Sequence, residues 1–186
     1  MKKENLSAAD ALKRLKAGNL NYLNSKMNSG DVSPEIRRET AENGQKPYAV
    51  IVGCSDSRVI PESIFSAGIG ELFVIRVAGN VIDNHQLGSI EYAVEHLGCK
   101  LVIVLGHTFC GAVGAAAGKN GGYVKFITDK IRSAIGEETD AVKASILNIK
   151  QSVSKIEKLI KRTDGLHITG ALYHTESGKV DFDITD

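Results

Sequence analysis

Residues 49–58 read Ala-Val-Ile-Val-Gly-Cys-Ser-Asp-Ser-Arg, and this stretch decides the fold class. Its apolar half is short, aliphatic and stops at Gly53, which is typical of a strand that is buried on both faces. A thiol, a carboxylate and a guanidinium then follow at alternate positions, as Cys54, Asp56 and Arg58. Ligands of open α/β sheets bind beyond the carboxyl ends of the strands, so this turn is the first candidate for a functional site.

Similar apolar runs recur along the chain and alternate with amphipathic segments. Besides the strand at 48–52, the pattern predicts strands at 72–77, 101–105, 168–173 and 179–184. Helices are predicted between them, at 61–67, 83–97, 112–117, 123–135 and 139–161. The last two strands are joined by a short turn that ends in Gly178, which suits a hairpin. We therefore expect an α/β fold with a mostly parallel central sheet of about five strands, an antiparallel last strand and flanking helices.

Two helices are predicted before the first strand. One covers residues 7–23, with Ser7 as its N-cap, and the next begins near 33–35 with Pro34 at its first position. The sequence Gly44-Gln45-Lys46-Pro47 ends the second helix. We expect one domain over residues 1–186, in which residues 1–44 form a helical arm, and a second subunit is a candidate for the surface on which this arm packs.

Composition narrows the class of protein further. The 186 residues carry a net charge of +1 without a block of like charges, so we expect no nucleic-acid partner. No apolar run approaches the roughly 20 residues that span a bilayer, and the N-terminus lacks the apolar core of a secretory signal. Three cysteines that follow or flank buried strands favour a cytoplasmic chain with free thiols or a metal over a disulfide scaffold.

Two further candidate ligands follow the third predicted strand, as His107 and Cys110. Parallel strands open on the same edge of a sheet, so these side chains can converge with Cys54. Two thiolates and one imidazole favour zinc, and this set leaves a fourth position open in catalytic sites. A single buried cysteine is more often a packing residue, and we interpret Cys99 in that way. The joint placement at two strand ends distinguishes the other three.

Asp56 and Arg58 have two possible roles beside such a site. In a turn, a pair of this kind is usually a solvated ion pair worth under about 1 kcal/mol. Next to a metal, Arg58 can hold Asp56 ionised so that its carboxylate accepts a hydrogen bond from a metal-bound water or hydroxide. Alternatively, Asp56 can become the fourth ligand and close the site.

The two motifs, Cys54-Ser-Asp-Ser-Arg58 and His107-Thr-Phe-Cys-Gly111, together resemble the signature of the β-class carbonic anhydrases. The similarity extends from about Gln45 to the C-terminus. It includes the segments Phe73-Val-Ile-Arg-Val-Ala-Gly-Asn80, Gly88-Ser-Ile-Glu-Tyr-Ala93 and Gly170-Ala-Leu-Tyr173.

This resemblance implies a zinc enzyme that hydrates CO2 reversibly to bicarbonate by attack of zinc-bound hydroxide. It implies one zinc ion per subunit on Cys54, His107 and Cys110, and a catalytic dyad of Asp56 and Arg58. The positions of Gln45 and Gly111 match residues that bind substrate or bicarbonate. The family also implies a homodimer or higher homo-oligomer with active sites at the dimer interface.

Two other functions remain open on the sequence alone. COS and CS2 are linear triatomic molecules like CO2, so the motifs do not exclude a hydrolase of either gas. A non-catalytic module that binds zinc or bicarbonate is the second alternative, although retention of both dyad residues argues against it.

Overall fold

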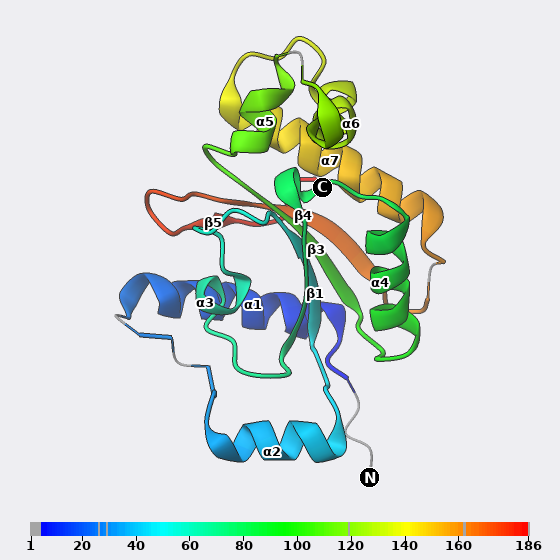
Figure 1. The fold of residues 1–186 in the computed structure, drawn as a ribbon. Helices are drawn as coiled ribbons and strands as arrows, with labels where there is room; N and C mark the ends of the chain where they lie inside the picture. Colours follow the sequence, from blue (N-terminus) through cyan, green and yellow to red (C-terminus); the bar gives the residue numbers. More distant parts are fainter. Residues whose placement is uncertain (1–4, 26, 29, 119, 162, 186) are drawn as a thin grey trace.

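A computed structural model describes residues 5–25, 27–28, 30–118, 120–161 and 163–185 of the chain. The predicted α/β architecture is confirmed (Figure 1). The strands are β1 (Ala49–Gly53), β2 (Leu72–Arg76), β3 (Leu101–His107), β4 (His167–Tyr173) and β5 (Val180–Asp181). The α-helices are α1 (Ala8–Asn24), α2 (Pro34–Asn43), α3 (Pro61–Ile64), α4 (Asn84–Glu95), α5 (Gly111–Ala116), α6 (Lys125–Ile135) and α7 (Ala141–Leu159). Short 3-10 helices are η1 (Ala78–Asn80) and η2 (Gly122–Val124).

The strands form one sheet in the order β2-β1-β3-β4-β5. The first four are parallel, and β5 pairs antiparallel with β4, as the sequence predicts. Gly53 of β1 lies opposite Leu105 of β3, so the residues after these strands emerge at the same edge. The carboxyl edge of the two central strands therefore carries both predicted ligand segments.

Side chains of the central strands alternate between two apolar layers. Ala49 and Ile51 pack on the layer that includes α1 and α3, whereas Val50 and Val52 pack on the layer that includes α4 and α7. All four side chains are fully buried. Each large aliphatic residue buried in this way contributes about 1.5–3 kcal/mol, which holds the strands rigidly enough to position the groups that follow them.

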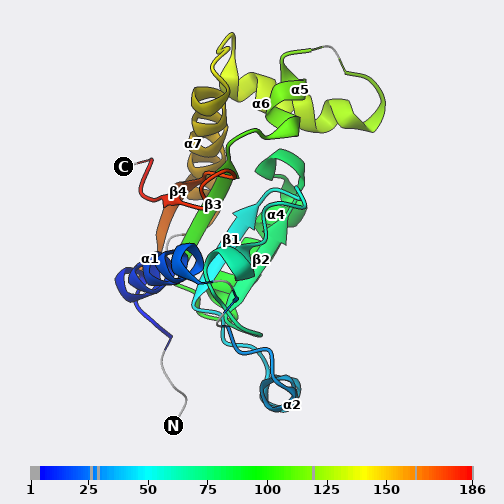
Figure 2. The same ribbon diagram turned by 90° about the vertical axis from the view of Figure 1, so that its left-hand side faces the viewer.

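The two N-terminal helices differ in how they relate to the sheet. In α1, Ala11 and Leu15 are fully buried in the first layer, and the buried Asn19 bonds to the β4–β5 hairpin at Gly178 and Val180. By contrast, α2 has no buried residue and stands apart from the sheet in both views (Figures 1 and 2). Within the segment predicted to be an arm, α1 therefore belongs to the core of its own chain, and only α2 projects.

Several boundaries differ from those that the sequence predicts. The helix predicted at 61–67 ends at Ile64, and the strand predicted at 179–184 is reduced to Val180–Asp181. The second difference has a local cause: Asp183 adopts a positive φ of 58°, which breaks the ladder before Ile184 donates to the Gly170 carbonyl. The turn glycine Gly178 has the expected positive φ, 78°.

A third apolar cluster lies beyond the carboxyl edge of the sheet, where α5 and α6 stand above the strand ends in Figure 1. It joins Cys54 and Cys110 to aliphatic residues of α5, α6 and the start of α7, among them Val113, Ile131 and Ala144. This cluster shields the site from bulk water on one side. Among the helices of the described residues, none is both long and apolar enough to cross a membrane.

Candidate metal centre

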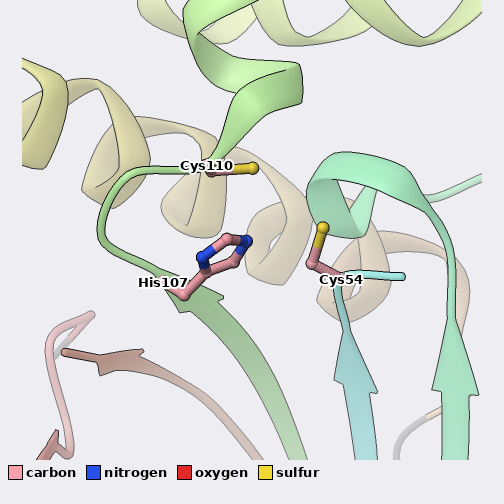
Figure 3. A group of neighbouring side chains, drawn as sticks. All are labelled: Cys54, His107 and Cys110. Atoms are coloured by element: carbon pink, nitrogen blue, oxygen red, sulfur yellow. The ribbon is translucent and has the colours of Figure 1, made fainter. Parts of the chain in front are cut away.

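Three predicted ligands converge at the carboxyl edge of the sheet (Figure 3). Cys54 follows β1, His107 ends β3, and Cys110 is the N-cap residue of α5. A ligand atom from each of the three side chains lies within 4.8 Å of the other two. All three residues are buried, with at most 7% of their surface exposed. Parallel pairing of β1 and β3 produces this convergence.

The imidazole of His107 is fixed so that one nitrogen faces the two sulfurs. Its Nδ1 lies 2.9 Å from the Thr108 carbonyl, to which it donates in the neutral tautomer that binds metals. Thr108 is anchored in turn, because its amide donates to the Tyr173 carbonyl and its hydroxyl bonds to Thr175. The Nε2 atom is buried without a hydrogen-bond partner among the described residues. An orphaned buried acceptor that faces two thiols is the arrangement a metal ligand requires.

The two thiols form a coupled pair. Hydrogen bonding from Cys110, together with the backbone amides of Asp56 and Gly79, outweighs burial and lowers the pKa of Cys54 to about 4. The adjacent Cys54 sulfur, and then burial, raise the pKa of Cys110. A divalent cation would relieve the repulsion between two thiolates. Two sulfurs and an imidazole nitrogen fit zinc, because soft ligands in this set are characteristic of zinc sites.

Asp56 faces Arg58. Its carboxylate accepts from the Arg58 Nε at 3.0 Å, from Nη2 at 2.8 Å and from the Arg58 amide at 3.0 Å. These bonds hold the pKa of Asp56 well below its usual range, the largest contribution coming from the guanidinium. One carboxylate oxygen lies 3.9 Å from the Nε2 of His107. Asp56 is therefore an ionised acceptor beside the three candidate ligands and is not itself one of the converging group.

Arg76 is a residue that the sequence reasoning did not single out. It ends β2, next to β1 in the sheet, and its guanidinium donates to the carbonyls of Cys54 at 3.0 Å and Asp56 at 2.7 Å. These two bonds hold the turn that carries both candidate side chains, Cys54 and Asp56. The sequence does place Arg76 at the end of a predicted strand. Only the order of the strands in the sheet shows that this strand neighbours β1, so that Arg76 lies beside the turn that follows β1.

The two predicted substrate residues lie in different places. Gly111 follows Cys110 at the start of α5, and apart from its chain neighbours and its own helix backbone, no atom of the described residues lies within 4 Å of the position that a Cβ would take there. Gln45, by contrast, precedes β1 and is exposed. Since β1 has five residues that each advance about 3.3 Å, Gln45 lies at the opposite edge of the sheet from Cys54. One chain does not bring Gln45 to the candidate metal centre.

Comparison with known proteins agrees with this geometry. A family model described as carbonic anhydrase matches residues 49–180. Carbonic anhydrase 2 of Mycobacterium tuberculosis is 38% identical over 182 residues, covering 95% of this chain and 82% of the relative. The crystal structure of the β-carbonic anhydrase CafA of Aspergillus fumigatus aligns with a TM-score of 0.70 at 28% identity, covering 96% of this chain and 91% of that one. A tetrameric β-carbonic anhydrase of Sordaria macrospora aligns with a TM-score of 0.69 at 26% identity, covering 94% of each chain.

An α/β sheet with a Cys-His-Cys group at its carboxyl edge thus coincides with sequence similarity over nearly the whole chain. The chain belongs to the β-carbonic anhydrase family and is an enzyme of that family.

Proposed function

We propose that this enzyme hydrates CO2 reversibly to bicarbonate and a proton, with one zinc ion per subunit on Cys54, His107 and Cys110. The observation that carries the proposal is the Nε2 of His107, which is buried, faces the two sulfurs and has no hydrogen-bond partner in the part of the chain that the structure describes. When bound, zinc would lower the pKa of a water molecule in its open fourth position, so that hydroxide is available near neutral pH to attack CO2.

Asp56 and Arg58 supply the second part of the proposal. The ionised carboxylate of Asp56 is an acceptor that can orient a hydroxyl group beside the metal position. Arg58 keeps that carboxylate charged and turned away from the ligands through its bonds to both carboxylate oxygens. Its Nη2 also donates to the Phe109 carbonyl, which ties the dyad to the loop between His107 and Cys110. For Asp56 to close the site as a fourth ligand, it would have to give up its bonds to Arg58.

We infer that Gln45 acts in the site of a second subunit. It is exposed at the far edge of its own sheet, so it can meet a metal centre only if another chain brings it there. The projecting helix α2 ends one residue before Gly44 and is free to contact a partner. A homodimer or higher homo-oligomer follows from this inference, and within the predicted dimerisation arm, residues 1–44, α2 is the part that would reach the partner. Gly111 would offer its backbone amide to substrate from within the same chain as the metal.

The proposal is tested by measuring zinc content and CO2 hydration on the same preparation. We expect one zinc per subunit and hydration that is lost when a chelator removes the metal and returns on adding zinc. Assays with COS and CS2 in parallel distinguish the alternative substrates. A zinc-loaded protein that hydrolyses either gas but does not hydrate CO2 would overturn the proposed reaction.

We further propose that the enzyme resides in the cytoplasm. Its three cysteines are all free, and ligation by Cys54 and Cys110 requires reduced thiols, which that compartment maintains. Cell fractionation that recovers the protein from an oxidising compartment would contradict this.

A further inference from the structure

The backbone at residues 78–80 contributes to the surroundings of Cys54. The amide of Gly79 donates to the Cys54 sulfur at 3.2 Å, within the buried interior. Gly79 has a positive φ of 65°, and a Cβ at this position would lie 2.6 Å from the Cδ1 of Ile131. The left-handed conformation favours glycine here, and any larger residue would also displace the end of the Ile131 side chain. The direction of this amide therefore depends on what holds the η1 turn.

Two side chains of α7 hold this turn from the other side. The amide group of Asn148 donates to the Gly79 carbonyl at 2.8 Å, and the hydroxyl of Ser152 donates to the Asn80 carbonyl at 3.4 Å. Asn148 is 3% exposed, and its buried polar amide group is satisfied by its hydrogen bond to the Gly79 carbonyl of the turn. A buried side-chain hydrogen bond between segments 69 residues apart fixes the turn more strongly than an exposed one would.

An N–H bond to a thiolate has a direct effect on a metal that the thiolate binds. It draws electron density from sulfur and so reduces the charge that the sulfur donates to the ion. It also fixes the direction of the sulfur lone pairs. Outer partners of this kind typically change metal affinity 10- to 100-fold when they are removed.

We propose that Asn148 is a positioning residue of the metal centre, which holds Gly79 so that its amide bonds to the Cys54 sulfur. Asn148 does not touch the ligands or the substrate, and it acts through the η1 turn. The proposal rests on the proposed role of Cys54 as a metal ligand.

Two substitutions remove the donor while keeping the size of the side chain, Asn148→Leu and Asn148→Asp. Ser145→Ala is the matched control: Ser145 is also a buried polar residue of α7, 3% exposed, but its hydroxyl donates to the Ala141 carbonyl of its own helix and, among the described residues, to no group of the η1 turn. Each full-length protein is stripped of metal and reconstituted with Co2+, whose thiolate charge-transfer absorption reports on the sulfur. Zinc affinity is measured separately by competition with a chelator.

We expect the charge-transfer band of both Asn148 variants to move to longer wavelength, because a sulfur without its N–H partner gives up electrons more readily. Zinc affinity should fall roughly tenfold, because loss of the fixed sulfur direction outweighs the stronger electron donation. Ser145→Ala should leave the band unchanged and the affinity within about twofold of the parent protein, which is below the range expected for a lost outer partner.

A lower melting temperature alone does not support the proposal, since removal of any buried hydrogen bond can cause it. An unchanged band and unchanged zinc affinity in Asn148 variants that fold would overturn the positioning role. If both Asn148 variants fail to fold, Ser152→Ala tests the same turn, because Ser152 also donates to it. We then expect a smaller shift of the charge-transfer band to longer wavelength. An unchanged band would contradict the proposed role of the turn. If the parent protein gives no thiolate band with Co2+, the ligand assignment of Cys54 fails, and the positioning role fails with it.

Discussion

A buried thiol lies near each end of β1, and the two differ in chemistry. Cys54 follows the carboxyl end, where hydrogen bonds lower its pKa to about 4. Cys99 lies near the amino end, where its sulfur bonds to the Pro47 carbonyl and burial raises its pKa to about 12. Both residues are less than 5% exposed. Burial alone therefore keeps the Cys99 thiol neutral. The hydrogen-bond donors gathered around Cys54 at the carboxyl edge favour its thiolate, which is the form that can bind a metal.

The difference between the two thiols is tested most severely by removing each of them. Cys54→Ser should reduce zinc from about one ion per subunit to a trace, and CO2 hydration should fall on the order of 10³-fold or more, because the metal supplies the hydroxide. Cys99→Ala should retain zinc and turnover and lose only stability, by about 1–3 kcal/mol for a small cavity and one lost hydrogen bond. Metal analysis and initial rates decide between these outcomes. Full zinc occupancy in folded Cys54→Ser would show that the ligand assignment is wrong.

The carboxyl edge also contains the ion pair of Asp56 and Arg58. It differs from ion pairs elsewhere on the surface because it lies beside the candidate ligands. Asp56→Asn should keep its zinc but lose turnover roughly 10²-fold, as expected for a positioned carboxylate acceptor. The matched control is Asp129→Asn, because Asp129 pairs with Arg132 at 2.8 Å on an exposed face of α6. That variant should keep full activity. Equal rates in the two variants, at equal zinc content, would remove Asp56 from the mechanism.

Gln45, which precedes the amino end of β1, contributes to the reaction only if a second subunit brings it to a metal centre, as proposed above. Gln45→Ala should lower CO2 hydration about tenfold, the worth of a hydrogen bond of about 1.4 kcal/mol, with zinc content unchanged. Zinc analysis and initial rates on the purified variant check this.

Mixed dimers decide which chain supplies Gln45. Unfolding and refolding Gln45→Ala together with Cys54→Ser yields mixed dimers. If the residue acts across the interface, each mixed dimer has one site with an intact metal centre and an intact Gln45, so activity rises above that of either parent variant. If Gln45 acts within its own chain, mixing yields no gain.

The sequence predicted the carboxyl edge better than the amino edge for a physical reason. Apolar runs that end in polar residues define strand ends, and parallel topology then brings Cys54, His107 and Cys110 together without further information. The η1 turn was not predicted, because Ala78-Gly79-Asn80 has no periodicity and its amide direction depends on a φ value that contacts with α6 and α7 fix. The resemblance that predicts a role for Gln45 does not show that the residue lies at the opposite edge of its own sheet, because that placement depends on the length and direction of β1.

The smallest expected effect concerns Tyr48, at the amino end of β1. Burial raises its pKa to about 12, with Arg14 partly opposing the shift and Glu71 adding to it. An unfolded tyrosine ionises near pH 10, so folding favours the neutral form, and the stability from this preference is complete below pH 10 and lost as pH rises toward 12. Between pH 9 and pH 11, this group should lower the free energy of unfolding by about 1.3 kcal/mol, just under the free energy that corresponds to one pKa unit.

Tyr48→Phe isolates this contribution, because phenylalanine keeps the ring and cannot ionise. Urea unfolding at pH 9 and pH 11 should show that the parent protein loses more stability across this interval than the variant does. Equal losses would mean that the Tyr48 hydroxyl reaches solvent, and that the amino end of β1 is less tightly packed than its carboxyl end. The contrast between the two ends would then extend from chemistry to packing.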